Sequence, residues 1–208
     1  MWFPIIITVL VGYLLGNLNG AVCMSKLLAH EDVRNQGSGN AGLTNFIRNY
    51  GAASSVTVIL IDAGKAVLGC LVGGLMLTSY GMYTEGLAIG GLAVMLGHDF
   101  PALLGFRGGK GILSGAVIAF TVDWRVGLVV LGVFLVAYLL TQYVSLGSVL
   151  GALAFSVGFA VFHYHNLVVM LCGVAMGLLA VFMHRGNIVR LLQGKERKTN
   201  LFGKGEKR

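Results

Sequence analysis

Seven apolar stretches constrain what this chain can fold into more strongly than any other feature of its sequence. A helix needs about 20 apolar residues to cross the roughly 30 Å hydrocarbon core of a bilayer, and all but one of the stretches approach or exceed that length. The exception, residues 112–122, would extend only about 16 Å as a helix. The pattern predicts an all-α integral membrane protein with seven transmembrane helices, or six if 112–122 does not cross. The stretches cover 2–24, 52–78, 82–104, 112–122, 126–143, 147–163 and 165–183.

The composition supports this class. Charged residues make up 11% of the chain and hydrophobic residues 56%, whereas a soluble domain has about 25% charged residues. The 32 glycines suit helices that pack closely in a membrane. Cys23, Cys70 and Cys172 all lie in apolar stretches and provide neither a disulfide framework nor a metal-binding spacing. We therefore expect no metal site.

The distribution of positive charge predicts the orientation. With seven spans, one side of the membrane carries almost all of the 15 Lys and Arg residues, in the segments 25–51, 98–111 and 184–208. The other side carries Arg125, and Lys65 lies within a span. Because cytoplasmic loops are enriched in Lys and Arg, the N-terminus is predicted outside and the C-terminus in the cytoplasm. We expect residues 1–198 to form one domain and 199–208 a basic, disordered tail.

A net charge of +7 has a straightforward explanation in a membrane protein. The negative cytoplasmic face of the membrane and anionic substrates both attract such a chain, so nucleic acid is not the expected partner. Membrane lipids are expected partners, and nothing in the sequence indicates an obligate protein partner.

Residues 35–49, NQGSGNAGLTNFIRN, form a polar, glycine-rich segment at a membrane boundary. Successive backbone N–H groups in such turns bind anions, and the start of a following helix adds its positive dipole end. An ATP-binding Walker loop is excluded because Leu43 stands where that motif has lysine. An ordinary flexible loop remains the alternative. The side chains that can bind an anion here are Ser38, Asn40, Thr44, Asn45 and Arg48.

Residues 106–111, FRGGKG, place Arg107 and Lys110 in a glycine-rich segment, where few side chains cover the backbone. Gly108 and Gly109 would let a ligand approach the backbone closely. Lys110 can then bind a second phosphate through its point charge and Arg107 through two parallel N–H donors. The alternative is a simple positive topology marker, which needs charge but no glycines.

His184, Asn187 and Arg190 recur at helical spacing directly after the last apolar stretch. A histidine beside cations can act as a base or donate a hydrogen bond to a phosphate. The alternative is an interfacial basic anchor for lipid head groups.

Polar residues also occur within the apolar stretches. Asp62 and Lys65 are one helical turn apart, and an ionised residue near the bilayer centre costs about 2.5–3.5 kcal/mol on insertion scales. Such residues are often functional, although a structural ion pair is the alternative. Ser145 and Ser148 can face a site or a neighbouring helix. The sequence contains no G-x-S-x-G nucleophile elbow and no HExxH zinc signature, so a cytoplasmic site for phosphate-bearing molecules remains.

At these residues the sequence resembles the PlsY family, the acyl-phosphate:glycerol-3-phosphate acyltransferases of bacteria. Residues 37–51, 97–111 and 184–198 resemble the three cytoplasmic motifs of that family in order and spacing. Asp62-x-x-Lys65 and the SLGS run at 145–148 agree as well, and the similarity covers essentially the whole chain.

The resemblance implies a multi-pass enzyme of the bacterial cytoplasmic (inner) membrane with its active site facing the cytoplasm. The implied reaction moves a fatty acyl group from acyl phosphate to the 1-hydroxyl of sn-glycerol 3-phosphate, giving lysophosphatidic acid and phosphate without a cofactor. The implied catalytic residues are Ser38, Lys110, His184 and Asn187. The implied substrate-binding residues are Gly37, Gly39, Asn40, Thr44, Asn45, Arg48, Lys65, Arg107, Gly108, Gly109 and Ser148. The general base is either His184 or a phosphate oxygen of the donor.

A transporter or flippase for a phosphorylated metabolite would need the same cationic pocket and is the competing hypothesis. It predicts polar residues along a path to both sides of the membrane. The outer halves of the apolar stretches are nearly uncharged, apart from Glu85, Asp123 and Arg125, which favours the enzyme.

Overall fold

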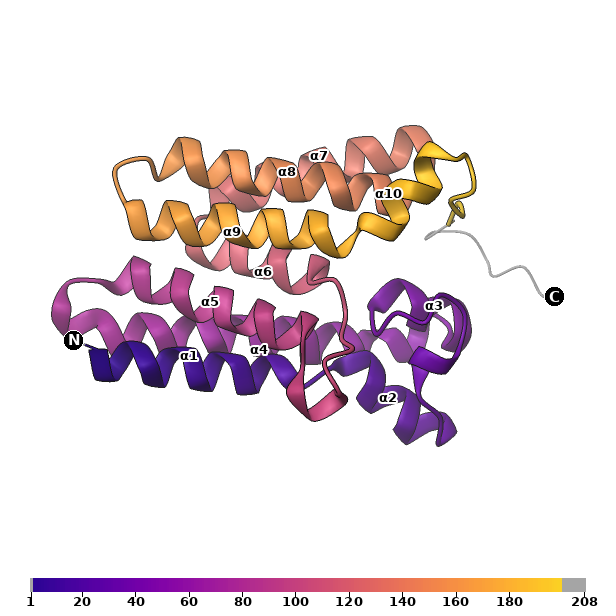
Figure 1. Ribbon diagram of the computed structural model, residues 1–208, viewed down its shortest axis with the longest axis horizontal. Helices are drawn as coiled ribbons and strands as arrows, with labels where there is room; N and C mark the ends of the chain where they lie inside the picture. Colours follow the sequence, from indigo (N-terminus) through magenta and orange to yellow (C-terminus); the bar gives the residue numbers. More distant parts are fainter. Residues whose placement is uncertain (1, 200–208) are drawn as a thin grey trace.

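The computed structural model describes residues 2–199, and in this part of the chain all regular secondary structure is helical. The long helices run side by side along the long axis of the molecule (Figure 1). Helices α1, α4 and α5 form one group, α7, α8 and α9 form another, and α6 lies between the two groups. The elements are α1 (Trp2–Asn17), α2 (Gly20–Ala29), η1 (Val33–Asn35), α3 (Leu43–Tyr50), α4 (Ala52–Leu77), η2 (Thr78–Tyr80), α5 (Tyr83–Asp99), η3 (Ala102–Leu104), α6 (Ile112–Val122), α7 (Trp124–Thr141), α8 (Val144–Phe162), α9 (Leu167–Met183) and α10 (Arg185–Leu192).

Five helical segments of the described chain are long and apolar enough to cross a membrane. A sixth arises if α9 and α10, which are bent by 54° at their junction, are counted as one span. Helix α6 has the same bounds as the predicted stretch 112–122 and, with 11 residues, is too short to qualify by length. The prediction of a helical membrane protein is therefore confirmed, and the predicted count of seven stays a prediction.

The first apolar stretch is broken, whereas the sequence indicated one continuous helix over 2–24. Helix α1 ends at Asn17, and the side chain of Asn19 caps the start of α2 by accepting a hydrogen bond from the Val22 N–H. Lys65 of α4 stabilises the break, since its Nζ donates to the carbonyl oxygens of Gly16 (3.3 Å) and Leu18 (2.6 Å). These carbonyls lie where the helical hydrogen-bond pattern is interrupted, so the lysine supplies donors there.

Glycines bring the helices of the first group into backbone contact. A Cβ added at Gly73 of α4 would lie 2.0 Å from the carbonyl oxygen of Gly86 in α5, and one at Gly97 would lie 2.1 Å from that of Tyr13 in α1. Any side chain at these positions would force the helices apart. This close approach confirms the interpretation of the high glycine content.

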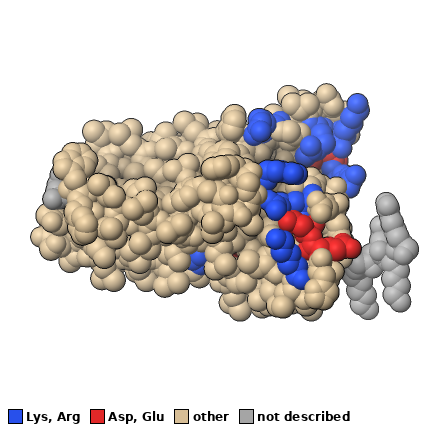
Figure 2. All heavy atoms as spheres, turned by 60° about the horizontal axis from the view of Figure 1, so that its bottom comes forward, with Lys and Arg blue, Asp and Glu red and all other residues tan. Residues whose placement is uncertain are grey.

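The charged residues gather at one end of the molecule. Figure 2 shows Lys and Arg side chains clustered there with acidic side chains among them, while the rest of that face is almost free of charge. The same end carries α3, α10 and the connection between α5 and α6, opposite the N-terminus (Figure 1). Of the predicted tail 199–208, only Thr199 lies within the described residues. Its N–H donates to the Gln142 carbonyl (3.0 Å), and its carbonyl accepts from the Tyr138 hydroxyl (3.0 Å).

Candidate active site

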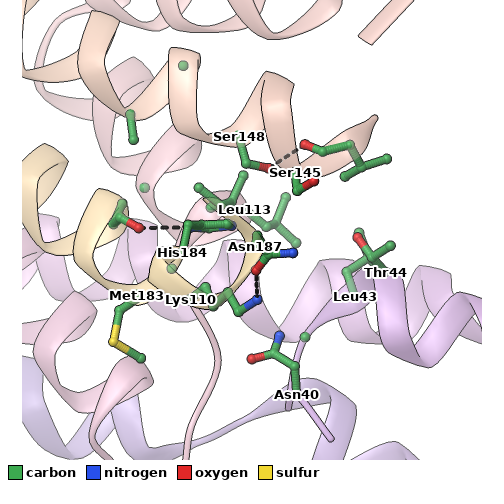
Figure 3. Close-up of a pocket in the computed structure, with 18 of the residues that line it drawn as sticks. Asn40, Leu43, Thr44, Lys110, Leu113, Ser145, Ser148, Met183, His184 and Asn187 are labelled. Carbon is green, nitrogen blue, oxygen red and sulfur yellow. Dashed lines mark hydrogen bonds between the residues drawn. The ribbon is translucent and has the colours of Figure 1, made fainter. Parts of the chain in front are cut away.

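A cavity of about 930 Å³ opens at the charged end. Its mouth is formed by the glycine-rich loop before α3, the start of α6, the α9–α10 junction and residues 196–197. Its inner part is lined by apolar residues of α6, α7, α8 and α9. Most of the predicted site residues line it, namely Gly37, Ser38, Gly39, Asn40, Thr44, Asn45, Arg48, Lys110, Ser148, His184 and Asn187. Three segments far apart in the sequence therefore meet around one space, as Figure 3 shows.

Asn45 holds the glycine-rich loop in shape. Its Oδ1 accepts the Ser38 N–H (2.9 Å), and its Nδ2 donates to the carbonyls of Val33 (3.0 Å), Gln36 (3.1 Å) and Asn40 (3.1 Å). Because both ends of the amide already bind backbone groups, Asn45 organises the loop, and the direct substrate contact of its side chain stays a prediction. Ser38 and Asn40 also line the cavity.

Gly37 has both a backbone conformation and surroundings that favour glycine. Its φ of +59° lies in the left-handed region, which other residues adopt at a cost. A Cβ there would also lie 2.4 Å from Asn45 Oδ1. The loop therefore needs this glycine for its conformation.

Lys110 begins a chain of hydrogen bonds across the mouth of the cavity. Its Nζ donates to Asn187 Oδ1, Asn187 Nδ2 donates to Glu196 Oε1 (2.9 Å), and Arg190 Nε donates to Glu196 Oε2 (2.8 Å). Burial, together with the positive charge of Arg190, lowers the pKa of Lys110 to about 8. Burial raises the pKa of Glu196, but the hydrogen bonds from Asn187 and Arg190 outweigh it and leave that pKa below its usual value.

His184 lies at the bend between α9 and α10 and is almost fully buried. Its Nδ1 is 2.8 Å from the Ala180 carbonyl oxygen (Figure 3). A carbonyl only accepts hydrogen bonds, so Nδ1 carries the proton. In the neutral ring, Nε2 is then the acceptor, which is the form required of a base or of a hydrogen-bond acceptor for a substrate hydroxyl.

Two further predicted residues lie at the cavity with partners of their own. Ser148 Oγ donates to the Val144 carbonyl one turn earlier in α8 (2.8 Å), so its hydroxyl proton is already used. Arg48 Nη2 donates to Thr199 Oγ1. The arginine thus connects α3 with the C-terminal segment at the mouth.

Four predicted substrate-binding residues, Lys65, Arg107, Gly108 and Gly109, are absent from the cavity lining. Lys65 Nζ instead lies 2.8 Å from Asp62 Oδ1 and 2.8 Å from His98 Nδ1, and its side chain is 1% exposed. This arrangement favours a structural ion pair, the alternative that the sequence left open, and the predicted substrate contact of Lys65 stays a prediction.

The two glycines before Lys110 serve packing. A Cβ at Gly109 would lie 2.1 Å from His98 Nε2, and one at Gly108 would lie 2.0 Å from the His98 carbonyl oxygen. The loop therefore closes around His98, and the glycines permit this contact. Arg107 is exposed and does not line the cavity.

Sequence reasoning missed Glu196 and Arg34. Glu196 is a lone acidic residue within the basic run KERK, and its isolation among cations was the available signal. Arg34 joins two loops, since its Nη1 donates to the carbonyls of Leu104 (2.7 Å) and Arg107 (2.9 Å). Asp32 orients it through Nε (2.9 Å) and Nη2 (2.7 Å). The guanidinium thereby connects the loop of Ser38 to the loop of Lys110.

Replacing Arg34 with Ala is expected to lower kcat/KM for the phosphate-bearing substrate by about 10- to 100-fold. The two anion-binding loops would lose their link, and a displacement of about 1 Å in a site can cost roughly 100-fold. Arg34→Lys should not rescue, because one ammonium cannot bind both the carboxylate and two carbonyls. Arg107→Ala removes a nearby exposed cation and is the matched control. An equal fall in kcat/KM in Arg34→Ala and Arg107→Ala would contradict the linking role of Arg34 and would indicate that net charge alone matters.

The helices and the cavity together define an integral membrane protein whose cavity has a cationic, amide-lined mouth and an apolar interior between its helices. Comparison with known proteins identifies the particular family. The model of the glycerol-3-phosphate acyltransferase family matches residues 6–194, and this chain belongs to that family and is an enzyme with that activity.

Individual relatives agree over nearly the full length. The glycerol-3-phosphate acyltransferase of Thermoanaerobacter sp. (strain X514) is 38% identical over 193 residues, 93% of this chain and 94% of that protein. That of Finegoldia magna is 38% identical over 195 residues, with 93% and 96% covered. The crystal structure of PlsY, an integral membrane glycerol 3-phosphate acyltransferase, in its glycerol 3-phosphate form is 33% identical. It has a TM-score of 0.83 and covers 96% of this chain and 99% of that one.

Proposed function

We propose that this enzyme transfers a fatty acyl group from acyl phosphate to the 1-hydroxyl of sn-glycerol 3-phosphate, as the first step of bacterial phospholipid synthesis. The observation that carries the proposal is that one cavity combines a cationic mouth with an apolar interior. This cavity can hold the phosphates of both substrates at its mouth and the apolar acyl chain of the donor in its interior. Crystal structures of PlsY in a glycerol 3-phosphate form and in a lysophosphatidic acid form support the acceptor and the product.

The proposed chemistry needs no protein nucleophile. Acyl phosphate is an activated anhydride, so the 1-hydroxyl oxygen attacks its carbonyl carbon, the bond from that carbon to the phosphate oxygen breaks, and inorganic phosphate leaves. The hydroxyl proton passes to the base. Holding the two substrates together and neutralising their charges supplies most of the acceleration.

The roles follow from the positions of the side chains at the cavity. Ser38, Asn40, Arg48 and Lys110 bind phosphate, and His184 and Asn187 bind and orient glycerol 3-phosphate. His184 Nε2 is the proposed base, since the hydrogen bond from Nδ1 to Ala180 leaves it as the acceptor. A phosphate oxygen of the donor is the competing base.

We further propose that the charged end faces the cytoplasm at the inner membrane, with seven spans and the N-terminus outside. The enrichment of Lys and Arg at this end supports that orientation (Figure 2). Helix α6 is the seventh crossing, extended by the flanking residues. The α8–α9 connection lies at the end opposite the cavity mouth (Figure 1). Asp123, between α6 and α7, lies 3.0 Å from His163 at that connection, which supports an odd number of crossings.

A transporter is less consistent with the interior of the molecule. The deepest α8 residue that lines the cavity is Phe155, and behind it Phe159 and Val126 are 0% exposed. At the far end, Asp123 accepts hydrogen bonds from Arg125 and lies 3.0 Å from His163. No polar path through the described residues continues from the cavity to that end.

The test is turnover by the purified protein in lipid, with labelled glycerol 3-phosphate and either palmitoyl phosphate or palmitoyl-CoA. We expect lysophosphatidic acid from the acyl phosphate alone. Product from palmitoyl-CoA alone would contradict the proposed donor. Retained glycerol 3-phosphate binding without product from either donor would favour the transporter.

A further inference from the structure

Gly115 of α6 is an unusual glycine in the wall of the cavity. It is buried and lines the cavity, yet a Cβ added there would find no heavy atom within 4 Å. A buried residue with open space beside it faces an internal void, and the void here is the cavity. The chain thus leaves room at this position that an alanine or a valine would fill.

The other glycines of the spans that line the cavity have packing partners. A Cβ at Gly147 would lie 2.9 Å from the Phe134 carbonyl oxygen, one at Gly151 3.6 Å from that of Val130, and one at Gly177 2.1 Å from Ser156 Oγ. Close helix packing therefore accounts for Gly147 and Gly177, whereas a Cβ at Gly151 would make ordinary van der Waals contact with its neighbours. Helix packing does not account for Gly115, and its backbone has no positive φ that would require glycine. Glycine also weakens a helix interior relative to alanine, so the open space needs another explanation.

The position of Gly115 indicates what the space holds. It lies in the first turn of α6, three residues after the helix begins at Ile112, and so about 4.5 Å along the helix from the end that carries the Lys110 loop. On the facing side, the lining of α8 runs from Val144 to Phe155, about 16 Å along a helix. That depth matches one leaflet of a bilayer whose hydrocarbon core is about 30 Å thick. The void therefore has the depth of a fatty chain, and Gly115 lies near its entrance.

We propose that the open space beside Gly115 admits the part of a long acyl chain that a short acyl group does not reach, so that position 115 determines which acyl donors fit. The inference rests on the proposed function, in which the donor phosphate is bound by Lys110 and its chain runs into the apolar interior. A side chain at 115 narrows the cavity further in than the phosphate and the start of the chain. A short acyl group ends before this point, whereas a long one has to pass it.

The test compares palmitoyl phosphate with butyryl phosphate, at saturating glycerol 3-phosphate, in wild type, Gly115→Ala and Gly115→Val. We expect the ratio of kcat/KM for palmitoyl over butyryl phosphate to fall at least 10-fold in Gly115→Val and less in Gly115→Ala. The KM for glycerol 3-phosphate should stay within about 3-fold. Gly132→Val is the matched control, because Gly132 of α7 also has open space at its Cβ but is exposed and lies outside the cavity lining. Its ratio should equal that of wild type.

An unchanged ratio in Gly115→Val, or an equal loss with both donors, would overturn the inference. If Gly115→Val does not fold, Gly115→Ala decides, since alanine favours the helix and should keep Tm at or above that of wild type. If wild type uses neither acyl phosphate, the proposed donor fails. The same comparison is then made with palmitoyl and butyryl thioesters of coenzyme A, so the two failures are distinguishable.

Discussion

Replacing Lys110 with Ala is expected to lower kcat by about 100- to 1,000-fold while the folded protein remains in the membrane. Removing one preorganised electrostatic donor from an active site has an effect of this size. Lys110 is half-buried at the mouth and donates to Asn187, so its charge acts in a partly dehydrated space, where it is stronger than at the surface. Turnover of palmitoyl phosphate and glycerol 3-phosphate by protein in lipid, with Tm measured in parallel, is the test. Retained turnover would refute the role.

The pH dependence provides a second readout of the same residue. Because burial and Arg190 lower the pKa of Lys110 to about 8, the cation is present below that pH and is lost as the pH rises through it. We expect kcat/KM to fall above about pH 8 in wild type. In Lys110→Arg the remaining activity should keep its plateau to higher pH, because a guanidinium stays charged. Arg107→Ala, a nearby cation outside the cavity, should keep the wild-type profile.

The sequence predicted the helices well where apolar length alone decides them. Stretch 52–78 corresponds to α4, and 112–122 corresponds to α6 residue for residue. It also predicted that three distant segments share one site, because alternate connections of a membrane bundle lie on the same side. The break at Asn17–Gly20 was not predictable, since it depends on Lys65, which is remote in sequence and replaces the missing helical donors.

Residue types identified the site more reliably than they identified individual roles. Asn45 looks like a ligand for an anion, and only the fold shows that its amide binds Ser38 and three backbone carbonyls. Gly109 looks like a position for close substrate approach, yet the nearest group is the His98 ring. Conversely, Gly115 carries no signal in sequence, because its distinguishing feature is an empty volume enclosed by several helices.

Replacing His184 with Gln is expected to lower kcat by about 100-fold or more, in the range typical of a lost general base. The imidazole is fixed by Nδ1 donating to Ala180, which directs the unprotonated Nε2 to serve as the acceptor. Glutamine keeps a similar size and neutral charge but cannot take up the proton. The pH–rate profile of wild type should have a lower limb that is absent in His184→Gln.

His163→Gln is the matched control, since it makes the same substitution at the opposite end, where the ring pairs with Asp123 at 3.0 Å. Its kcat and pH profile should equal those of wild type. If His184→Gln raises KM for glycerol 3-phosphate but keeps kcat and the lower limb, His184 binds the acceptor and a donor phosphate oxygen takes the proton. The two bases thus make different predictions for one variant, because the lower limb is lost together with the histidine only if His184 is the base.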